Sequence, residues 1–554
     1  KVHSLCGIND GAAIILIMPK KKADLNKICE IFLEEQNNFV EYGLNETELK
    51  DHKKELIFFY RYSFEYVESL ASSLGMEELQ CKYERFFEYP ERINKIKNSE
   101  LNKIIKKYLC KDHLYIFHHG KRKFDKSVLL EKLNLPSKKT FKNIQAKEYY
   151  ETHLQNGMKV LLKKVYGKPT VGISLSFEVS QLNETVKNRG LNLLTSGLML
   201  YGNEKRNYQQ VLNYCTSNGI NLGIIPQLET TSVKMKCFKE MLPITIELLS
   251  EVVQTPVFPS GYFYNLQQTY KSNLDRIRDY PIFFATKLWK ELIFGKYSNM
   301  INQTGTKSSL KCISLKKIRK WFRDYYHPQN MSLAIVGEFN FNQVIEICEQ
   351  TFKSDNTQNT MIGQQFIYDP SSQKNKKTKK NIDQSIIHLG GFGCSFKEKE
   401  KNTAFHVLAQ IIGGDTNSIL FNELREKRGL AYSVEFDFHS YRELGYYVAT
   451  AIVDKKREGE AIDIIRSVLD NIKKNGISKE DLQKTKNYIR GQRLMEEESM
   501  LSQAQMLSIL EAIGFGYEYY RKREERLEKV SLKAIHNVAE EYFNEDEFFI
   551  HVLS

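Results

Sequence analysis

The sequence predicts an α+β protein assembled from repeated domains, and three observations support this fold class. Long amphipathic stretches lie between strand-like segments without regular β–α–β alternation, which is typical of segregated helix and sheet layers. One pattern of helix stop and helix cap occurs twice, and one pattern of helix before strand occurs three times. The chain of 554 residues is long enough for two to four domains of one kind.

Composition narrows the function classes. The chain is 41% hydrophobic and 27% charged, as in an ordinary globular protein, and its formal net charge is +13. The lysines are scattered and no nucleic-acid recognition motif is present, so we expect no nucleic-acid partner and ascribe the charge to a basic substrate chamber or to solubility. No apolar run reaches the length of a membrane span, so none is expected. Nine cysteines without a C-x-x-C pair favour reduced thiols, which leaves the compartment, cytoplasmic or periplasmic, open.

The first segment looks like the end of a domain. The sequence starts at Lys1 in what resembles mid-domain sequence, so we expect that a further N-terminal part precedes it. A buried strand is predicted over Ala12–Met18, followed by an amphipathic helix that Gly43 ends. Asn45 then begins a second helix, with Glu48 placed to complete a capping box.

The same order of elements returns near the C-terminus. A strand over Tyr446–Val453 precedes an amphipathic helix, which ends at Gly476. Ser478 then takes the cap position and Asp481 the acidic position of the next helix, as Asn45 and Glu48 do in the first copy. This internal repeat indicates that the first and last segments are related.

An amphipathic helix precedes a strand at three places with identical apolar spacing. The three strands that follow these helices are predicted over Leu114–Phe117, Met331–Val336 and Phe548–Val552. Because one spacing recurs three times, we interpret these helices as the ends of three related domains.

The segments between the repeats set the domain boundaries. A hairpin over Tyr149–Leu162 with a turn at Asn156-Gly157 and a strand over Val171–Phe177 open the middle domain, and a strand over Ser385–Leu389 opens the last one. The polar, lysine-rich stretch before that strand is interpreted as a loop or linker rather than a nucleic-acid patch. The predicted organisation is the C-terminal part of a domain over 1–126, a linker over 127–147, a domain over 148–352, a linker or loop over 353–380 and a domain over 381–554.

One stretch of the last domain, Gly413–Val434, carries the strongest functional signal. A Gly pair and a cluster of capping residues lead into a helix, which ends in a basic cluster at Gly429 and turns directly into a strand over Leu430–Phe438. Arg425 and Tyr432 therefore lie near one corner. From spacing alone, a solvated arginine and a tyrosine packed on the sheet is the favoured interpretation, because runs of charge are usually solvated faces.

The sequence of this stretch resembles that of the insulinase/pitrilysin family of zinc metallopeptidases. In that family a Gly-rich loop is followed by a helix of the form LF-x-x-LR-x-K-x-x-LAYS. The resemblance implies helices packed on one face of mostly antiparallel sheets. It also implies that Arg425 and Tyr432 are catalytic residues that face the substrate and stabilise the tetrahedral intermediate. Gly413 and Gly414 correspond to a substrate-binding loop, although the pair also fits a simple turn before a helix.

The zinc motif of that family, H-x-x-E-H, does not occur in this sequence. The resemblance places its two histidines and its glutamate at Asn192, Ser196 and Thr195, none of which is an ordinary zinc ligand. We therefore expect no metal and no cofactor in this chain, an inactive middle domain, and zinc in a missing N-terminal half.

Two functions follow as expectations. In the first, this chain is the C-terminal half of a zinc metalloendopeptidase that cleaves peptides in a closed chamber, and its partners are a zinc-bearing half, on the same polypeptide or a separate subunit, and the peptide substrate. In the second, the chain is a non-catalytic scaffold subunit built from degenerate metallopeptidase domains. The substrate, its length limit and the oligomeric state are not predicted.

Overall fold

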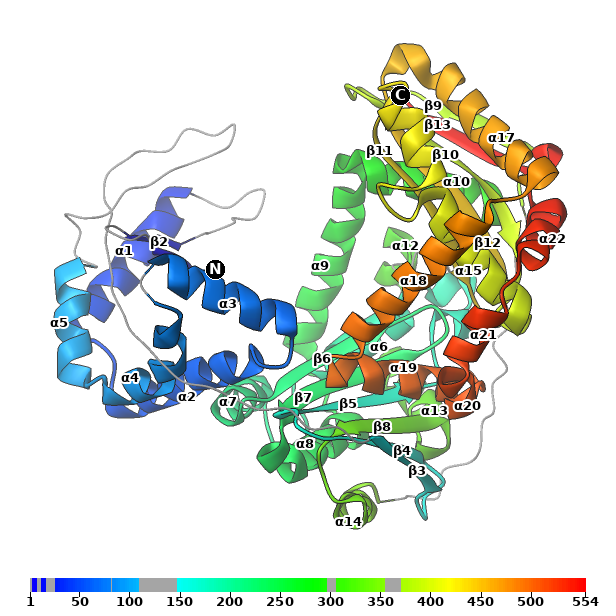
Figure 1. Ribbon diagram of the computed structural model, residues 1–554. Coiled ribbons are helices and arrows are strands. Elements are labelled where there is room, and N and C mark those ends of the chain that lie inside the picture. Colours follow the sequence, from blue (N-terminus) through cyan, green and yellow to red (C-terminus); the bar gives the residue numbers. More distant parts are fainter. Residues whose placement is uncertain are drawn as a thin grey trace.

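The computed structural model describes residues 2–6, 11–15, 25–80, 82–108, 147–295, 305–353 and 370–554. Along the chain it shows an N-terminal lobe, a six-stranded sheet with its helices and a five-stranded sheet with its helices (Figure 1). Residues 127–146 of the linker predicted over 127–147 and the predicted strand over Leu114–Phe117 lie outside the described residues, and Lys147 is the first residue of β3.

The N-terminal lobe consists of a strand pair followed by helices: β1 Val2–Cys6, β2 Gly11–Ile15, α1 Leu25–Tyr42, α2 Glu46–Tyr62, α3 Val67–Gln80, α4 Tyr89–Lys95 and α5 Asn98–Tyr108. The predicted capping box at the start of α2 is confirmed, because Asn45 accepts from the Glu48 N–H and Glu48 accepts from the Asn45 N–H. Residues 16–18 of the predicted first strand lie outside the described residues.

The first large sheet has the strand order β3-β4-β8-β5-β7-β6. Its strands are β3 Lys147–His153, β4 Lys159–Val165, β5 Thr170–Phe177, β6 Asn221–Pro226, β7 Thr231–Phe238 and β8 Met331–Gly337. Only β4 and β8 pair in parallel, so the sheet is mostly antiparallel. Its helices are α6 Leu191–Met199, α7 Tyr208–Asn218, α8 Leu242–Gln254, α9 Ser260–Asp279, α10 Pro281–Phe294, α12 Lys307–Lys311, α13 Leu315–Tyr325 and α14 Phe341–Thr351.

The second large sheet repeats this topology with the order β9-β13-β10-β12-β11. Its strands are β9 Asn375–Thr378, β10 Ser385–Gly393, β11 Ala431–Ser440, β12 Gly445–Val453 and β13 Phe549–Leu553. Again a single pair, β13 and β9, is parallel. Its helices are α15 Lys399–Gly413, α16 Ile419–Phe421, α17 Glu458–Asn475, α18 Lys479–Glu496, α19 Met500–Ala512, α20 Gly516–Arg521, α21 Arg523–Lys529 and α22 Leu532–Tyr542.

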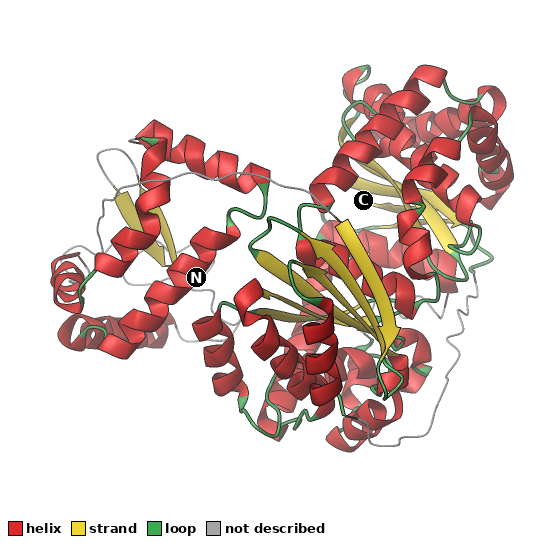
Figure 2. Ribbon diagram, turned by 60° about the horizontal axis from the view of Figure 1, so that its bottom comes forward, coloured by secondary structure: helices red, strands yellow, loops and turns green. Residues whose placement is uncertain are grey.

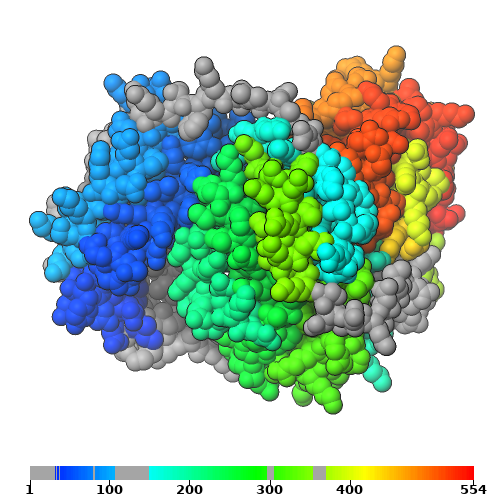
Figure 3. Space-filling model, turned by 90° about the horizontal axis from the view of Figure 1, so that it is seen from below, coloured from blue at the N-terminus to red at the C-terminus, as the bar shows by residue number. Residues whose placement is uncertain are grey.

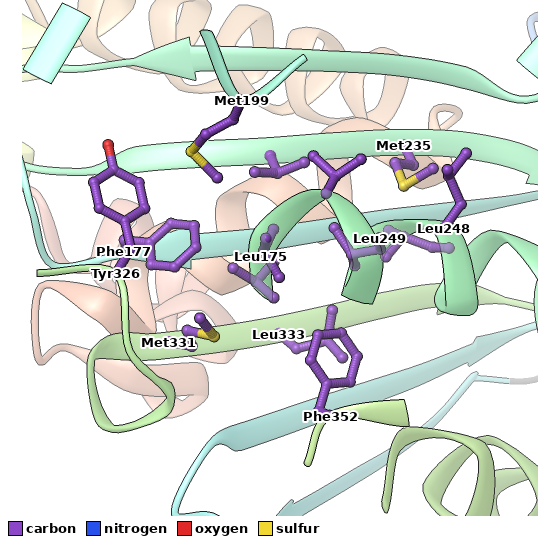
Figure 4. Close-up of a cluster of buried hydrophobic side chains, with 14 of the residues drawn as sticks. Leu175, Phe177, Met199, Met235, Leu248, Leu249, Tyr326, Met331, Leu333 and Phe352 are labelled. Atoms are coloured by element: carbon purple, nitrogen blue, oxygen red, sulfur yellow. The ribbon is translucent and has the colours of Figure 1, made fainter. Parts of the chain in front are cut away.

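The predicted α+β class with helices layered on mostly antiparallel sheets is confirmed (Figure 2). One face of the first sheet holds the largest core, to which Leu175, Phe177, Met235, Leu249 and Leu333 contribute (Figure 4). An equivalent core lies between the second sheet and its own helices. The helices predicted to end each domain are α5, α13 and α22, and each has 11 residues.

The other face of each sheet is covered by a helix from the opposite unit, which periodicity did not predict. Helix α19 packs across β5 and β8 of the first sheet, where Met500, Ala504 and Leu507 are buried against Leu161 and Val336. Helix α10 packs in return on β10 and β13 of the second sheet. This exchange ties the two units together (Figure 1).

The N-terminal lobe contacts the rest through α2, where Arg61 pairs with Glu240 at 2.7 Å and Tyr62 stacks on Phe238, and through two reciprocal contacts between the starts of α3 and α19. The fully buried Glu65 precedes α3 and accepts a hydrogen bond from the Met500 N–H at the start of α19, while Glu498 precedes α19 and accepts from the Val67 N–H at the start of α3. Glu65 also pairs with Lys236 of β7 at 2.6 Å. In Figure 3 the lobe lies directly against the first sheet unit.

The lysine-rich stretch is predicted to be a loop or linker, but its residues 375–378 form strand β9. This strand pairs in parallel with β13 at the edge of the second sheet, and Lys374 extends the pairing through its carbonyl, which accepts from the Ile550 N–H. The side chains of a short edge strand stay in water, so its composition is that of a loop. Residues 354–369 lie outside the described part of the chain.

Candidate functional site

Arg425 and Tyr432 lie at one exposed corner of the second sheet. Arg425 belongs to the π-helix Asn422–Glu426 that continues α16, and Tyr432 to the start of β11. The Arg425 Nη1 donates a hydrogen bond of 2.9 Å to the backbone carbonyl of Tyr432, and the guanidinium lies 5.1 Å from the centre of the Phe421 ring. The Tyr432 side chain is 67% exposed, so the alternative of a tyrosine packed into the sheet is wrong.

Both residues occupy irregular backbone. The Lys427 N–H bonds to the Asn422 carbonyl, an i→i+5 bond that widens the helix around Arg425. The register between β11 and β12 shifts between Ala431 and Ser433, so Tyr432 is the extra residue of a β-bulge. Wide turns and bulges interrupt regular hydrogen bonding, and they recur where a side chain must be aimed at a functional site.

Two neighbouring basic residues of the corner pair with one carboxylate. Glu423 accepts hydrogen bonds from both Lys427 and Arg428, and these two neighbours hold the pKa of the Glu423 carboxyl below its ordinary value. Within the described part of the chain, Arg425 pairs with no carboxylate. Since a guanidinium has five N–H donors, most of those on Arg425 remain available to a ligand.

The predicted substrate-binding glycines end a helix rather than forming an open loop. Gly413 is the buried last residue of α15, and a Cβ there would lie 2.4 Å from the backbone nitrogen of Phe436 on β11. Gly414 is exposed, and the atoms nearest to a Cβ there belong to the side chain of Gln410. Close packing of helix on strand therefore gives Gly413 a structural role, and substrate contact at the pair stays a prediction.

Asn192, the first zinc-motif position, is a fully buried structural residue of α6. Its Oδ1 accepts hydrogen bonds from the Tyr326 hydroxyl at 2.8 Å and the Trp321 Nε1 at 3.2 Å. Its Nδ2 donates to the Thr231 hydroxyl at 2.8 Å. Asn192 thus links α6 to α13 and β7, and both its oxygen and its nitrogen are engaged in buried hydrogen bonds.

The other two motif positions are bound to their own helix. The Thr195 hydroxyl donates to the Leu191 carbonyl at 2.8 Å, and the Ser196 hydroxyl donates to the Leu193 carbonyl at 3.2 Å. An amide and two hydroxyls already bonded in this way do not fit Zn²⁺, which prefers imidazole, thiolate and carboxylate ligands. In the described residues no group of three His, Cys, Asp or Glu side chains is arranged to hold a metal ion.

The start of α6 is held by a buried carboxyl group. Glu184 accepts hydrogen bonds from the N–H groups of Gly190 at 2.9 Å and Asn192 at 2.6 Å, which satisfies donors that the first turn of a helix leaves unpaired. Burial raises the pKa of Glu184 to about 8, against the opposing effect of these bonds. The sequence analysis did not single out this residue.

Two family models match the chain: Insulinase (Peptidase family M16) over residues 159–285, and Peptidase M16 inactive domain over residues 313–489. Together they account for more than half of the sequence. The chain belongs to the insulinase family, M16. The predicted membership is therefore confirmed.

Individual M16 proteins resemble the chain at low identity. An uncharacterized zinc protease of Bacillus subtilis, YmxG, is 21% identical over 393 residues, covering 71% of this chain and 95% of that protein. A non-peptidase homolog, YmxG, of Helicobacter pylori is 20% identical, covering 57% of this chain and 73% of that protein. The crystal structure of a peptidase M16 inactive domain from Pseudomonas fluorescens superposes with a TM-score of 0.68 at 17% identity, covering 73% of this chain and 97% of that one, so it shares the fold.

A cavity beside α6 was missed by the sequence analysis. It has a volume of about 450 Å³ and lies between α6, α7, α9 and the edge strand β6. Its lining comes from four elements and runs from Ser196 to Tyr270, and no local pattern signals such convergence. None of the helices in the described part is long and apolar enough to cross a membrane.

Proposed function

We propose that this M16 chain is the non-zinc half of a zinc metalloendopeptidase that cleaves peptides in a closed chamber. The observation that carries the proposal is the pairing of an exposed Arg425 on a π-helix with an exposed Tyr432 on a β-bulge. Both irregularities fall on the two residues that the family resemblance assigns to the substrate. In this proposal the domain over 148–352 is inactive and the domain over 381–554 carries the substrate site.

The chemistry of the two side chains fits stabilisation of an oxyanion. A guanidinium keeps its proton at all ordinary pH values, and a phenol donates one hydrogen bond, so both act as donors toward developing negative charge. The bond from Arg425 to the Tyr432 carbonyl fixes one side of the guanidinium and leaves its other donors to the ligand. Zinc in the other half would supply activated water, and this chain would bind and orient the peptide.

The exposed face of helix α3 favours a partner that has the same fold as this chain. The N-terminal lobe repeats the order of the last domain, so α1 corresponds to α17, α2 to α18 and α3 to α19. Helix α19 covers a sheet of the opposite unit, whereas Val67 and Met76 of α3 are 66% and 57% exposed. We infer that α3 covers the sheet of a zinc-bearing half, located on the same polypeptide or on a separate subunit.

The test combines the chain with its zinc-bearing half and measures peptide turnover with a quenched fluorescent peptide. The variant Arg425→Ala removes the assigned donor, and Arg428→Ala is the matched control because Arg428 lies on the same turn but pairs with Glu423. We expect a loss of about 10²–10³ in rate for Arg425→Ala and little change for the control. Absence of an H-x-x-E-H sequence in both the upstream segment and any partner subunit would rule out the peptidase.

The alternative is a scaffold subunit without catalysis. It is favoured by the names of two relatives, the Helicobacter pylori non-peptidase homolog and a probable inactive metalloprotease of Bacillus subtilis. The structural bonds of Asn192 fit both functions. The zinc content of the purified complete assembly separates the two functions. A scaffold holds no stoichiometric zinc, and the peptidase holds one ion per zinc-bearing half.

A further inference from the structure

The edge strand β6 and the cavity beside it form a site that the proposed peptidase function does not use. Strand β6 is the last strand of the first sheet, and in the described residues no strand pairs with its outer edge. The cavity of about 450 Å³ lies alongside, within the range of ordinary ligand sites. The inner walls come from Gly197 of α6 and Tyr270 of α9.

The pairing of β6 with β7 shows which backbone groups face outward. The Gln227 N–H bonds to the Thr230 carbonyl, and the register to β7 then stays constant along the strand. In an antiparallel ladder, hydrogen-bonded pairs alternate with non-bonded pairs, so Gly223 and Ile225 bond to β7. The N–H and carbonyl groups of Leu222 and Ile224 therefore face the open edge, where they can pair with another extended chain.

The side chains of these same residues line the cavity. Leu222 and Ile224 form one wall, and Leu212 of α7 lies at 40% exposure on another. A residue paired directly opposite one of them on an added strand points its side chain to the same face of the sheet. A bound strand therefore brings one of its side chains to the cavity, because the backbone edge and the cavity share these two residues.

The lining determines the kind of side chain that fits. No lining residue carries a formal charge. The walls combine aliphatic side chains with the rings of Tyr201, Tyr208 and Tyr270, and burial raises the pKa of Tyr270 to about 12, so its hydroxyl remains protonated. Burying a charged group here without a partner is costly, whereas an aromatic or branched aliphatic group gains contact on all sides.

We propose that β6 binds an extended peptide by strand addition and that the adjacent cavity receives one apolar or aromatic side chain of that peptide. This site lies in the zinc-less domain and needs neither Arg425 nor Tyr432. It is therefore a second peptide-binding site, separate from the corner of the other sheet.

The experiment measures binding of a fluorescein-labelled ten-residue peptide, rich in valine and threonine with one central phenylalanine, to the 554-residue chain by fluorescence anisotropy. Two peptide controls replace the phenylalanine with aspartate or N-methylate the backbone on either side of it. The variant Leu212→Arg introduces charge into the cavity, and Leu532→Arg on α22 is its matched control because Leu532 is 39% exposed. The variant Ile224→Pro removes one outward N–H, which proline at an edge strand tolerates.

We expect Leu212→Arg, Ile224→Pro and each altered peptide to weaken binding about tenfold or more, and Leu532→Arg to leave it unchanged. Arg425→Ala is also expected to bind normally, so a failure of the peptidase proposal leaves this result intact. No binding by the wild-type chain at millimolar peptide, or equal binding by all variants and peptides, would overturn the proposal.

Discussion

The Arg425 guanidinium and the Tyr432 backbone are joined by a hydrogen bond of 2.9 Å, so the two assigned donors are positioned as one unit. Tyr432→Phe removes the phenol while keeping this backbone bond. We predict that it lowers peptide turnover about 10²-fold in the complete assembly, and that the double variant with Arg425→Ala loses less than the product of the two single losses. Multiplicative losses in steady-state kinetics would contradict a shared role.

Substitutions at Gly413 and Gly414 test whether these glycines are needed for close packing of the fold. Gly413→Ala places a methyl group against the Phe436 backbone, whereas the atoms nearest to the new methyl group in Gly414→Ala are the movable end of the Gln410 side chain. We expect Gly413→Ala to lower the free energy of unfolding by about 1–3 kcal/mol and Gly414→Ala to have a much smaller effect. Urea unfolding of both variants gives the comparison. Equal stability of the two would show that the close approach of α15 and β11 is relieved without cost.

Asn192 is predicted to stabilise the fold and not to act in chemistry. Asn192→Ala removes the buried acceptor of the Tyr326 hydroxyl and the Trp321 Nε1, whereas the Thr231 hydroxyl still donates to the Val179 carbonyl. Each unsatisfied group costs about 1–3 kcal/mol, so thermal unfolding should shift clearly downward. The control Asn213→Ala alters an exposed asparagine of α7 that bonds only to the neighbouring Gln209, and we expect it to unfold like wild type.

Two buried histidines make stability depend on pH. His388 and His551 face each other on β10 and β13, and burial lowers the pKa of His388 to about 3 and that of His551 to about 4. The unfolded chain takes up these protons near pH 6.5, so stability is fully present above that pH and is lost as the pH falls toward 4.

Below pH 6.5, each of these histidines lowers the free energy of unfolding by about 1.4 kcal/mol per pH unit. We expect His388→Gln to reduce the slope of unfolding free energy against pH by about one proton between pH 6 and 4.5. Chemical unfolding at a series of pH values measures this slope. An unchanged slope would show that His388 is not the group responsible.

Glu65 is predicted to hold the N-terminal lobe in place. Glu65→Ala leaves Lys236 without its buried partner and the Met500 N–H without its acceptor. Breaking a buried pair in this way costs about 3–5 kcal/mol, so the segment between α2 and α3 should become more sensitive to limited proteolysis, while Arg61 and Tyr62 still hold α2 on the first sheet unit. The exposed neighbour Glu68 provides the control variant Glu68→Ala. If Glu68→Ala and Glu65→Ala are cleaved at the same rate, the role assigned to Glu65 is wrong.

The sequence by itself determined the elements and their repetition. The Asn45 capping box, the hairpin around Gly157 and the 11-residue helices α13 and α22 are confirmed because each depends on residues a few positions apart. Arg425 and Tyr432 could be predicted to lie at one corner for the same reason, because they are only seven residues apart along the chain.

Only the tertiary structure decided what those elements contact. The exchange of α10 and α19 between the sheets, the bonds that occupy Asn192 and the cavity beside β6 all join residues far apart in sequence. Strand β9 shows the same limit, because pairing with β13 depends on backbone groups that its lysine-rich side chains do not reveal. Local periodicity reports which face of an element is apolar, and long-range packing selects the partner that covers it.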